Sequence, residues 1–285
     1  MIDSPAVPRD SRRQRPPLMK NLLVAISACR LQVRRLREYA LSFWSSLVSI
    51  PVLMAVTYCA WRVVFGSRHM VNGYTFPEII SYYFLLRLVS VVIGQAASVA
   101  WNVWQDVNSG NLGNYLARPL DYGLLNLGKC AGPALLYLVA GTVTYAPAAL
   151  TLDLPVALTP VQIAFFGASV AGGFMVMYLT QFIVATLAFW IGRIDTLRDL
   201  LFEMYAFFSG SIIPNDFLPP LLQRIAGLLP LRFMFYVPVS ALLGRVPVED
   251  FPSLALSEIL WVAGLAVVSR LLWSRGIARF EGQGG

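Results

Sequence analysis

Residues 161–191 read VQIAFFGASVAGGFMVMYLTQFIVATLAFWI, a run without a single charged side chain. About 20 consecutive apolar residues in a helix are enough to cross the hydrocarbon core of a bilayer. A surface helix of a soluble protein has a charged or polar face opposite its apolar stripe. We therefore expect residues 161–191 to span a membrane, and we searched the rest of the chain for similar runs.

The composition of the whole chain agrees with a membrane protein. Its 285 residues are 57% hydrophobic and 13% charged, with a mean hydropathy of +0.65, whereas ordinary soluble chains are about 25% charged. The net charge of +7 also fits nucleic-acid binding, but basic residues gathered on one side of a membrane give the same number, and we favour that interpretation. The chain has a single histidine, and its three cysteines show no C-x-x-C spacing, which argues against a metal site.

Six runs are apolar enough to be spanning segments, and the fifth is short. They are residues 41–65, 79–103, 123–150, 161–191, 197–213 and 254–273. With both termini in the cytoplasm, the cytoplasmic side carries 16 Lys and Arg residues and the outer side carries 5. Because Lys and Arg concentrate on the cytoplasmic side, this arrangement is favoured. The predicted fold class is an all-α, polytopic membrane protein with six transmembrane helices.

The amino-terminal segment divides into a polar tail and an amphipathic helix. Residues 1–19 are rich in Pro, Arg and Ser, which predicts a disordered cytoplasmic tail, and Met19 is an alternative start to Met1. Within residues 20–40, apolar residues recur every three or four positions: Leu22, Ile26, Cys29, Val33, Leu36 and Ala40. The arginines lie off this stripe, so we expect a helix at the cytoplasmic membrane interface, with a soluble partner-binding helix as the alternative.

The segment after the fifth run is apolar but interrupted by prolines, among them Pro214, Pro230 and Pro238, with Gly244 after the last. Proline cannot continue the interior of a helix. We therefore predict that residues 214–243 form a re-entrant hairpin of two short helices, which dip into the membrane and return.

Residues 106–121, DVNSGNLGNYLARPLD, form a loop on the predicted cytoplasmic side. Ser109 or Asn111 is suited to cap a short helix, and Pro119 to stop it. Leu112, Tyr115 and Leu116 would form the apolar face of that helix, available to a groove on a soluble partner. The alternative is an ordinary loop between two helices.

Residues 123–130, GLLNLGKC, match the spacing of a phosphate-binding loop but have Cys130 in place of Ser or Thr. Such a loop needs a preceding strand, whereas these residues open an apolar run. We interpret the match as accidental, so that any ATP used by this protein must be hydrolysed by a partner. Gly128 with Gly132, and Ala168 with Gly172, are small residues four apart that permit close helix contact.

Residues 106–119 resemble the first cytoplasmic loop of ABC-2 type permeases. The shared pattern is an acidic residue, then Ser-Gly, then a short Leu-rich helix, and finally Arg-Pro. A second set of motifs is similar to the region after the fifth helix of that family: Ser209-Gly-Ser-Ile-Ile-Pro214, Leu228-Leu-Pro230-Leu-Arg-Phe, Tyr236-Val-Pro238 and Ala241-Leu-Leu-Gly244. With the six-span layout, the resemblance covers about residues 20–280.

The resemblance implies a single six-helix ABC-2 transmembrane domain over residues 20–285. Residues 20–40 would be its interfacial helix and residues 214–243 the hairpin that caps the outer end of the path. Residues 109–118 would be a coupling helix seated on the ATPase through Ser109, Gly110, Leu112, Tyr115, Leu116 and Arg118. The family also implies two ABC ATP-binding subunits, a second permease as homodimer or heterodimer, membrane lipids as surroundings, and a bacterial cytoplasmic (inner) membrane. No cofactor is expected on this chain, since ATP and Mg²⁺ would bind the partner.

Two charges fall deep within predicted spans, where an ionisable group costs about 2.5 to 3.5 kcal/mol and usually faces protein or water. These are Arg87 in the second span and Glu203 in the fifth. An interhelical ion pair, a substrate contact and separate roles are the alternatives.

The predicted function is outward transport of a hydrophobic or amphipathic substrate (drug, lipid or glycan-type), driven by a separate ATP-binding subunit. The alternative is a secondary transporter or channel without an ATPase partner, for which two deep charges are few. A membrane-embedded enzyme is disfavoured because no cluster of catalytic residue types lies at membrane depth.

Overall fold

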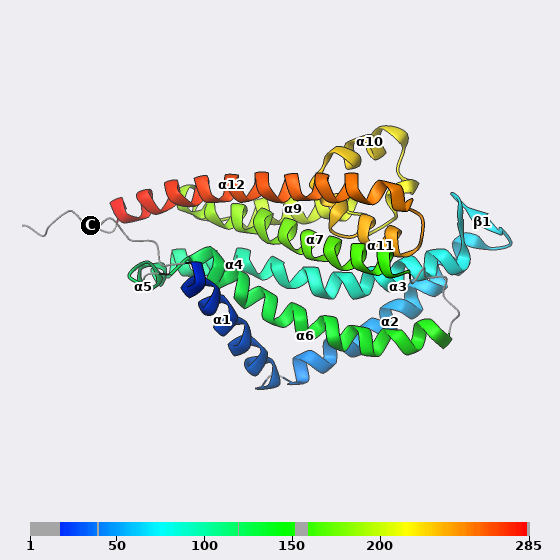
Figure 1. The fold of residues 1–285 in the computed structure, drawn as a ribbon, viewed down its shortest axis with the longest axis horizontal. Helices are drawn as coiled ribbons and strands as arrows, with labels where there is room; N and C mark the ends of the chain where they lie inside the picture. The colour runs from blue at the N-terminus through cyan, green and yellow to red at the C-terminus, as the bar shows by residue number, and fades with distance from the viewer. Residues whose placement is uncertain (1–17, 39, 119, 152–158, 284–285) are drawn as a thin grey trace, which may run out of the picture.

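The computed structural model describes residues 18–38, 40–118, 120–151 and 159–283. Its longer helices run mostly along one axis, while α1 crosses the others obliquely (Figure 1). These helices are α1 Leu18–Glu38, α2 Ala40–Phe65, α3 Phe76–Ile93, α4 Ser98–Asn108, α6 Tyr122–Thr151, α7 Pro160–Thr186, α9 Asp195–Phe208 and α12 Phe251–Gln283.

Short elements connect the long helices. The strands β1 Met70–Val71 and β2 Tyr74–Thr75 pair antiparallel, with Met70 opposite Thr75. The short helices are η1 Gly94–Ala97, α5 Leu112–Leu116, α8 Ala188–Ile191, η2 Asn215–Phe217, α10 Pro220–Leu228, η3 Pro230–Phe233, α11 Tyr236–Leu242 and η4 Val248–Asp250.

Helix α7 lies at the centre of the packing. The Thr159 side chain accepts a hydrogen bond from the backbone N–H of Gln162, and Pro160 occupies the first turn, so the sequence starts this helix at a defined residue. Helices α4, α11 and α12 pack on α7, as expected for a helix that is apolar on all sides. The prediction of a helix over residues 161–191 is confirmed as α7 followed by α8.

Helix α3 begins at a capping box. The Thr75 hydroxyl accepts from the backbone N–H of Glu78, and the Glu78 carboxylate accepts from the backbone N–H of Thr75 at 2.8 Å. At Gly94 the helix tightens into η1 and then continues as α4. The second predicted run is therefore one helical segment over Phe76–Asn108, longer than the 79–103 expected.

Among the described residues, four helical segments are long and apolar enough to cross a membrane: Phe76–Asn108, Tyr122–Val143, Pro160–Ile191 and Val248–Phe280. The other two predicted spans correspond to α2, with a shorter apolar stretch over Val52–Phe65, and to the 14-residue α9. The count of six spans therefore stays a prediction. All-α architecture is confirmed apart from the two-residue strands.

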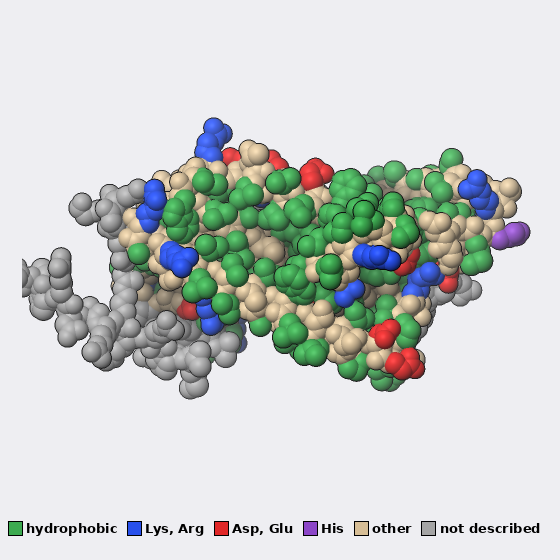
Figure 2. All heavy atoms as spheres, turned by 90° about the horizontal axis from the view of Figure 1, so that it is seen from above, with side chains coloured by type: hydrophobic (Ala, Val, Ile, Leu, Met, Phe, Trp, Pro, Cys, Tyr) green, Lys and Arg blue, Asp and Glu red, His purple; other side chains and the backbone are tan. Residues whose placement is uncertain are grey.

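The two ends of the long axis carry different elements (Figure 1). One end holds α5, the start of α1 and the end of α12. The other end holds β1, α10 and α11. Apolar side chains cover much of the middle of the face seen in Figure 2, as a membrane-spanning surface requires.

Helix α1 packs closely on α6 because two glycines leave room for its backbone. A Cβ at Gly128 would lie 2.2 Å from the Ala25 carbonyl oxygen, and one at Gly132 would lie 2.6 Å from the Cys29 carbonyl oxygen. The prediction that Gly128 and Gly132 permit close helix contact is confirmed. The predicted apolar stripe is only partly covered, since Ile26 is 41% exposed. Of the predicted tail, residues 1–17 lie outside the described residues.

Candidate functional site

The connection between α4 and α6 is a turn and a short helix, at the end of the molecule where α12 ends (Figure 1). Gly110 has a φ of +75°, and α5 begins two residues later at Leu112. Glycine adopts a positive φ freely because it has no Cβ, so Gly110 lets the chain turn directly into α5. We call the exposed residues of this segment the α5 surface: Ser109, Gly110, Asn111, Gly113, Asn114, Ala117 and Arg118.

The sequence predicted that the apolar face of α5 points toward a soluble partner, and the structure corrects this prediction. Leu112 is fully buried within the chain, and Tyr115 and Leu116 are half-buried against the hydrophobic core. Apolar side chains gain stability when they leave water, and the chain's own core already covers these. The predicted cap is also wrong for Asn111, which precedes α5 without a side-chain hydrogen bond. What a partner can reach here is mainly the polar α5 surface.

Aromatic rings connect α5 to the helices behind it. The Tyr115 and Tyr122 ring centroids are 5.4 Å apart, and Lys129 Nζ lies 5.0 Å from the Tyr115 ring centroid. Tyr122 opens α6, and its hydroxyl donates to Asp106 Oδ2 of α4 at 2.5 Å. The same ring stacks on Trp273 of α12 at 5.0 Å. A movement of α5 would therefore act on α4, α6 and α12 through direct packing contacts.

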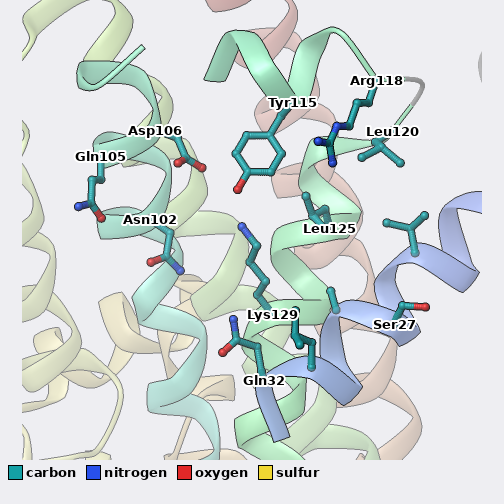
Figure 3. Close-up of a pocket in the computed structure, with 13 residues that line it drawn as sticks. Ser27, Gln32, Asn102, Gln105, Asp106, Tyr115, Arg118, Leu120, Leu125 and Lys129 are labelled. Carbon is teal, nitrogen blue, oxygen red and sulfur yellow. The ribbon is translucent and has the colours of Figure 1, made fainter. Parts of the chain in front are cut away.

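A cavity of about 640 Å³ lies beside this cluster, between α1, α4, α5 and α6. Figure 3 shows Lys129 reaching from α6 toward Tyr115, with Asn102 and Asp106 of α4 on one side and Arg118 on the other. The sequence did not predict this cavity, because its walls come from four segments that are far apart in the chain.

The residues of the accidental phosphate-loop match lie within helix α6. Gly128 faces the α1 backbone, and Lys129 faces the cavity. A phosphate-binding loop needs several backbone N–H groups that are free to point at the phosphate, whereas the interior of a helix uses them in its own hydrogen bonds. The structure thus supports the interpretation that this motif binds no nucleotide.

Arg87 and Glu203 are not brought together within the chain. Arg87 is half-buried on α3 and Glu203 is exposed on α9. The ion pairs among the described residues do not include one between them. An intrachain pair is therefore not formed, and a substrate contact or separate roles stay as predictions.

The sequence reasoning missed a third charge. Glu258 of α12 is only 6% exposed, and its Oε1 has no hydrogen-bond partner in the described part of the chain. It faces α7 at Gly172, where a Cβ would lie 2.3 Å from that oxygen. The buried Ser169 hydroxyl on α7 is likewise without a partner among the described residues. The sequence could have revealed this buried charge, because Glu258 is a glutamate within the predicted spanning run 254–273.

At the opposite end of the molecule, a polar cluster joins segments that are distant in sequence. Asp216 accepts hydrogen bonds from the Tyr74 hydroxyl at 2.5 Å and from the Tyr236 hydroxyl at 2.6 Å. The Arg245 guanidinium lies 3.5 Å from the Tyr74 ring centroid, and its Nη1 is 3.8 Å from Glu78 Oε2. Burial, reinforced by the bond to Asp216, raises the pKa of the Tyr74 hydroxyl. We call these five residues the outer cluster, after the side of the membrane on which the sequence predicts this end to lie.

The predicted hairpin residues surround the outer cluster. Pro214 precedes η2, Pro230 opens η3, and Pro238 lies in the first turn of α11, all three buried. Gly244 has a φ of +70° and ends α11. The two short helices expected over residues 214–243 correspond to α10 and α11. Their entry into a membrane stays a prediction.

These features define a class: a multi-pass, all-α membrane protein with a short, partly exposed helix at one end and a proline-rich segment of short helices at the other. The sequence model of the ABC-2 family transporter proteins matches residues 52–284, and the chain belongs to that family. It is therefore a membrane subunit of an ABC transporter, a transport rather than a catalytic subunit, and the family implies an ABC ATP-binding partner. No curated protein matches the chain.

Proposed function

We propose that this chain is the permease subunit of an ATP-driven exporter in the cytoplasmic (inner) membrane of a bacterium, with both termini in the cytoplasm. Two ATP-binding subunits supply the energy, and a second permease subunit, identical or different, completes the path. The substrate is hydrophobic or amphipathic. Family membership supports the transport role, and the layout of the two ends supports the orientation.

The single observation that carries the mechanism is the contact of α5 with the bundle. The exposed α5 surface is polar and accessible to a partner, while Leu112 and Tyr115 fix α5 against the rest of the chain. Tyr115 contacts Tyr122, which bonds to α4 and stacks on α12. In the proposed cycle, ATP binding draws the two partner subunits together, and α5 transmits that displacement as a movement of packed helices.

The outer cluster accounts for the second step of the proposed cycle, the opening of the outer end. Tyr74, Asp216 and Tyr236 join the β-hairpin to the proline-rich segment through side-chain bonds that can break without disturbing a helix. We propose that these bonds hold the outer end closed at rest. Rocking of the two permease halves would separate the segments and open the path outward.

The experiment is co-purification of the full chain with an ATP-binding protein from the cells that produce it. The variant Ser109→Glu/Asn114→Glu places two charges on the α5 surface and leaves the buried face of α5 intact. The control, Ser67→Glu/His69→Glu, adds two charges to exposed positions at the other end. We expect the α5 variant to lose at least about 10-fold of the recovered ATP-binding protein, because an unpaired charge at an interface is costly.

The control should retain the ATP-binding protein. Equal recovery with the α5 variant would overturn the role of the α5 surface. Transport by the chain without any ATP-binding protein would favour the alternative, a secondary transporter or channel.

A further inference from the structure

The cavity between α1, α4, α5 and α6 has the size and chemistry of a binding site. Its volume of about 640 Å³ falls within the range of about 300 to 1,000 Å³ typical of small-molecule sites. Val24, Ala28 and Leu31 lie three or four residues apart on one face of α1, so they form an apolar wall. Leu125 of α6 extends that wall.

The opposite part of the cavity is polar and cationic. Lys129 and Arg118 both line it, together with the side-chain amides of Asn102 and Gln105. Figure 3 shows the end of Lys129 near the Tyr115 hydroxyl and the end of Arg118 to the right of the same ring. The two cations therefore line the same cavity from different elements, Lys129 from α6 and Arg118 from the turn that follows α5.

Neither cation forms an ion pair within the part of the chain that the structure describes. The ion pairs and side-chain hydrogen bonds among the described residues include none made by Lys129 or Arg118. The acidic residue that lines the cavity, Asp106, accepts a hydrogen bond from Tyr122. Lys129 is half-buried, with its amine near the Tyr115 ring. A partly buried ammonium group without a carboxylate gains most from an anionic ligand, which forms short, charge-assisted hydrogen bonds.

The apolar wall specifies the other half of the ligand. A free inorganic anion would be held by the cations but would gain nothing from Val24, Leu31 and Leu125. An amphiphile satisfies both, with its anionic group at Lys129 and Arg118 and its hydrocarbon part along α1.

We propose that this cavity binds the anionic headgroup of a membrane amphiphile, a phosphate or carboxylate, between Lys129 and Arg118, with the apolar chain against α1. The site shares Arg118 with the α5 surface, but its other lining residues, Lys129 among them, lie outside that surface. It goes beyond the proposed export function and does not depend on it, since binding requires only this chain.

The test is titration calorimetry on the purified full chain in detergent, with dihexanoyl phosphatidylglycerol as the anionic probe. Dihexanoyl phosphatidylcholine is the zwitterionic probe, and sodium phosphate is the free-anion competitor. The variants are Lys129→Gln and Arg118→Gln. Arg118 is exposed, so its substitution leaves the fold intact even if Lys129→Gln does not. The matched control is Arg279→Gln, an exposed arginine of α12 outside the cavity.

We expect phosphatidylglycerol to bind at least about 10-fold more tightly than phosphatidylcholine, and each cavity variant to lose about 10-fold, because a charge-assisted hydrogen bond corresponds to a factor of this order. Arg279→Gln should bind as the unchanged chain does. Equal affinity for both lipids, or an equal loss with Arg279→Gln, would overturn the proposal. Displacement by phosphate at the concentration of the lipid would identify a free-anion site and would overturn it as well. Failure of this test leaves the proposed function intact, because no ATP-binding subunit takes part.

Discussion

The ring of Tyr122 stacks on the ring of Trp273, with centroids 5.0 Å apart and planes 1° from parallel. Tyr122 begins α6 directly after the α5 segment, and Trp273 lies near the end of α12. Phe182 and Phe189 also lie against Trp273, at 5.2 and 5.7 Å between centroids. Trp273 thus joins three segments at the end of the molecule that carries the α5 surface.

Trp273→Ala is expected to destabilise the subunit by about 3 to 5 kcal/mol, the usual effect of removing a packed aromatic ring. The matched control is Trp261→Ala on the same helix, since Trp261 is 37% exposed and makes no ring contact among those of the described residues. Thermal unfolding of the purified subunit measures both. Equal losses in the two variants would contradict the assignment of Trp273 as the joint between α6, α7, α8 and α12.

Gly128→Ala is expected to push α1 away from α6. The added Cβ would lie 2.2 Å from a backbone oxygen of Ala25, which a side-chain rotation cannot relieve, and overpacking of this kind costs about 1 to 3 kcal/mol. Labelling of Cys29, half-buried on α1, by a maleimide should become faster. The control is Gly264→Ala on α12, where a Cβ meets no atom within 4 Å. Unchanged labelling in Gly128→Ala would contradict the close α1–α6 contact.

The sequence predicted the parts of the fold that depend on one segment at a time. The uncharged run 161–191 had to be a buried or spanning helix, and it is the central one. Gly128 and Gly132 share a helix face by their spacing alone, so their packing role could be read from the sequence. The positions of the prolines likewise indicated short helices over residues 214–243.

The parts that failed depend on contacts between segments. Leu112 was expected to face a partner, but a helix of five residues has too few turns for its periodicity to show which side is buried. Tyr74 and Asp216 are 142 positions apart in the chain, and no local pattern relates them. Glu258 was overlooked because one acidic residue near the start of a long apolar run looks like an interfacial charge.

The outer cluster is expected to weaken at alkaline pH. Burial and the bond to Asp216 raise the pKa of Tyr74 above its usual value, about 10 in an unfolded chain. A raised pKa means that the neutral hydroxyl is the favoured form in the folded state, so its contribution to stability is complete below pH 10 and declines as pH rises above it. Thermal unfolding at pH 7 and pH 11 should therefore show a loss in the unchanged chain.

Tyr74→Phe is the matched variant for this prediction, because it keeps the ring under Arg245 and removes the ionisable group. We expect it to be about 0.5 to 1.5 kcal/mol less stable than the unchanged chain at pH 7, the usual contribution of one hydrogen bond. Between pH 7 and pH 11, Tyr74→Phe should lose less thermal stability than the unchanged chain does. An equal loss of stability in both proteins would mean that a group other than Tyr74 causes the alkaline destabilisation.

Glu258→Gln is expected to raise the stability of the subunit. Glu258 is only 6% exposed and faces α7 at Gly172, and its Oε1 has no hydrogen-bond partner in the described part of the chain, so an ionised carboxylate here would be removed from water without compensation. Glutamine has nearly the same shape and fits beside Gly172 without that charge. The control is Glu249→Gln, an exposed residue of η4, which should change the unfolding temperature little. An unfolding temperature of Glu258→Gln at or below that of the unchanged chain would contradict this account. It would mean that the carboxylate has a compensating partner in the folded protein, for which the buried Ser169 hydroxyl is the nearest source on α7.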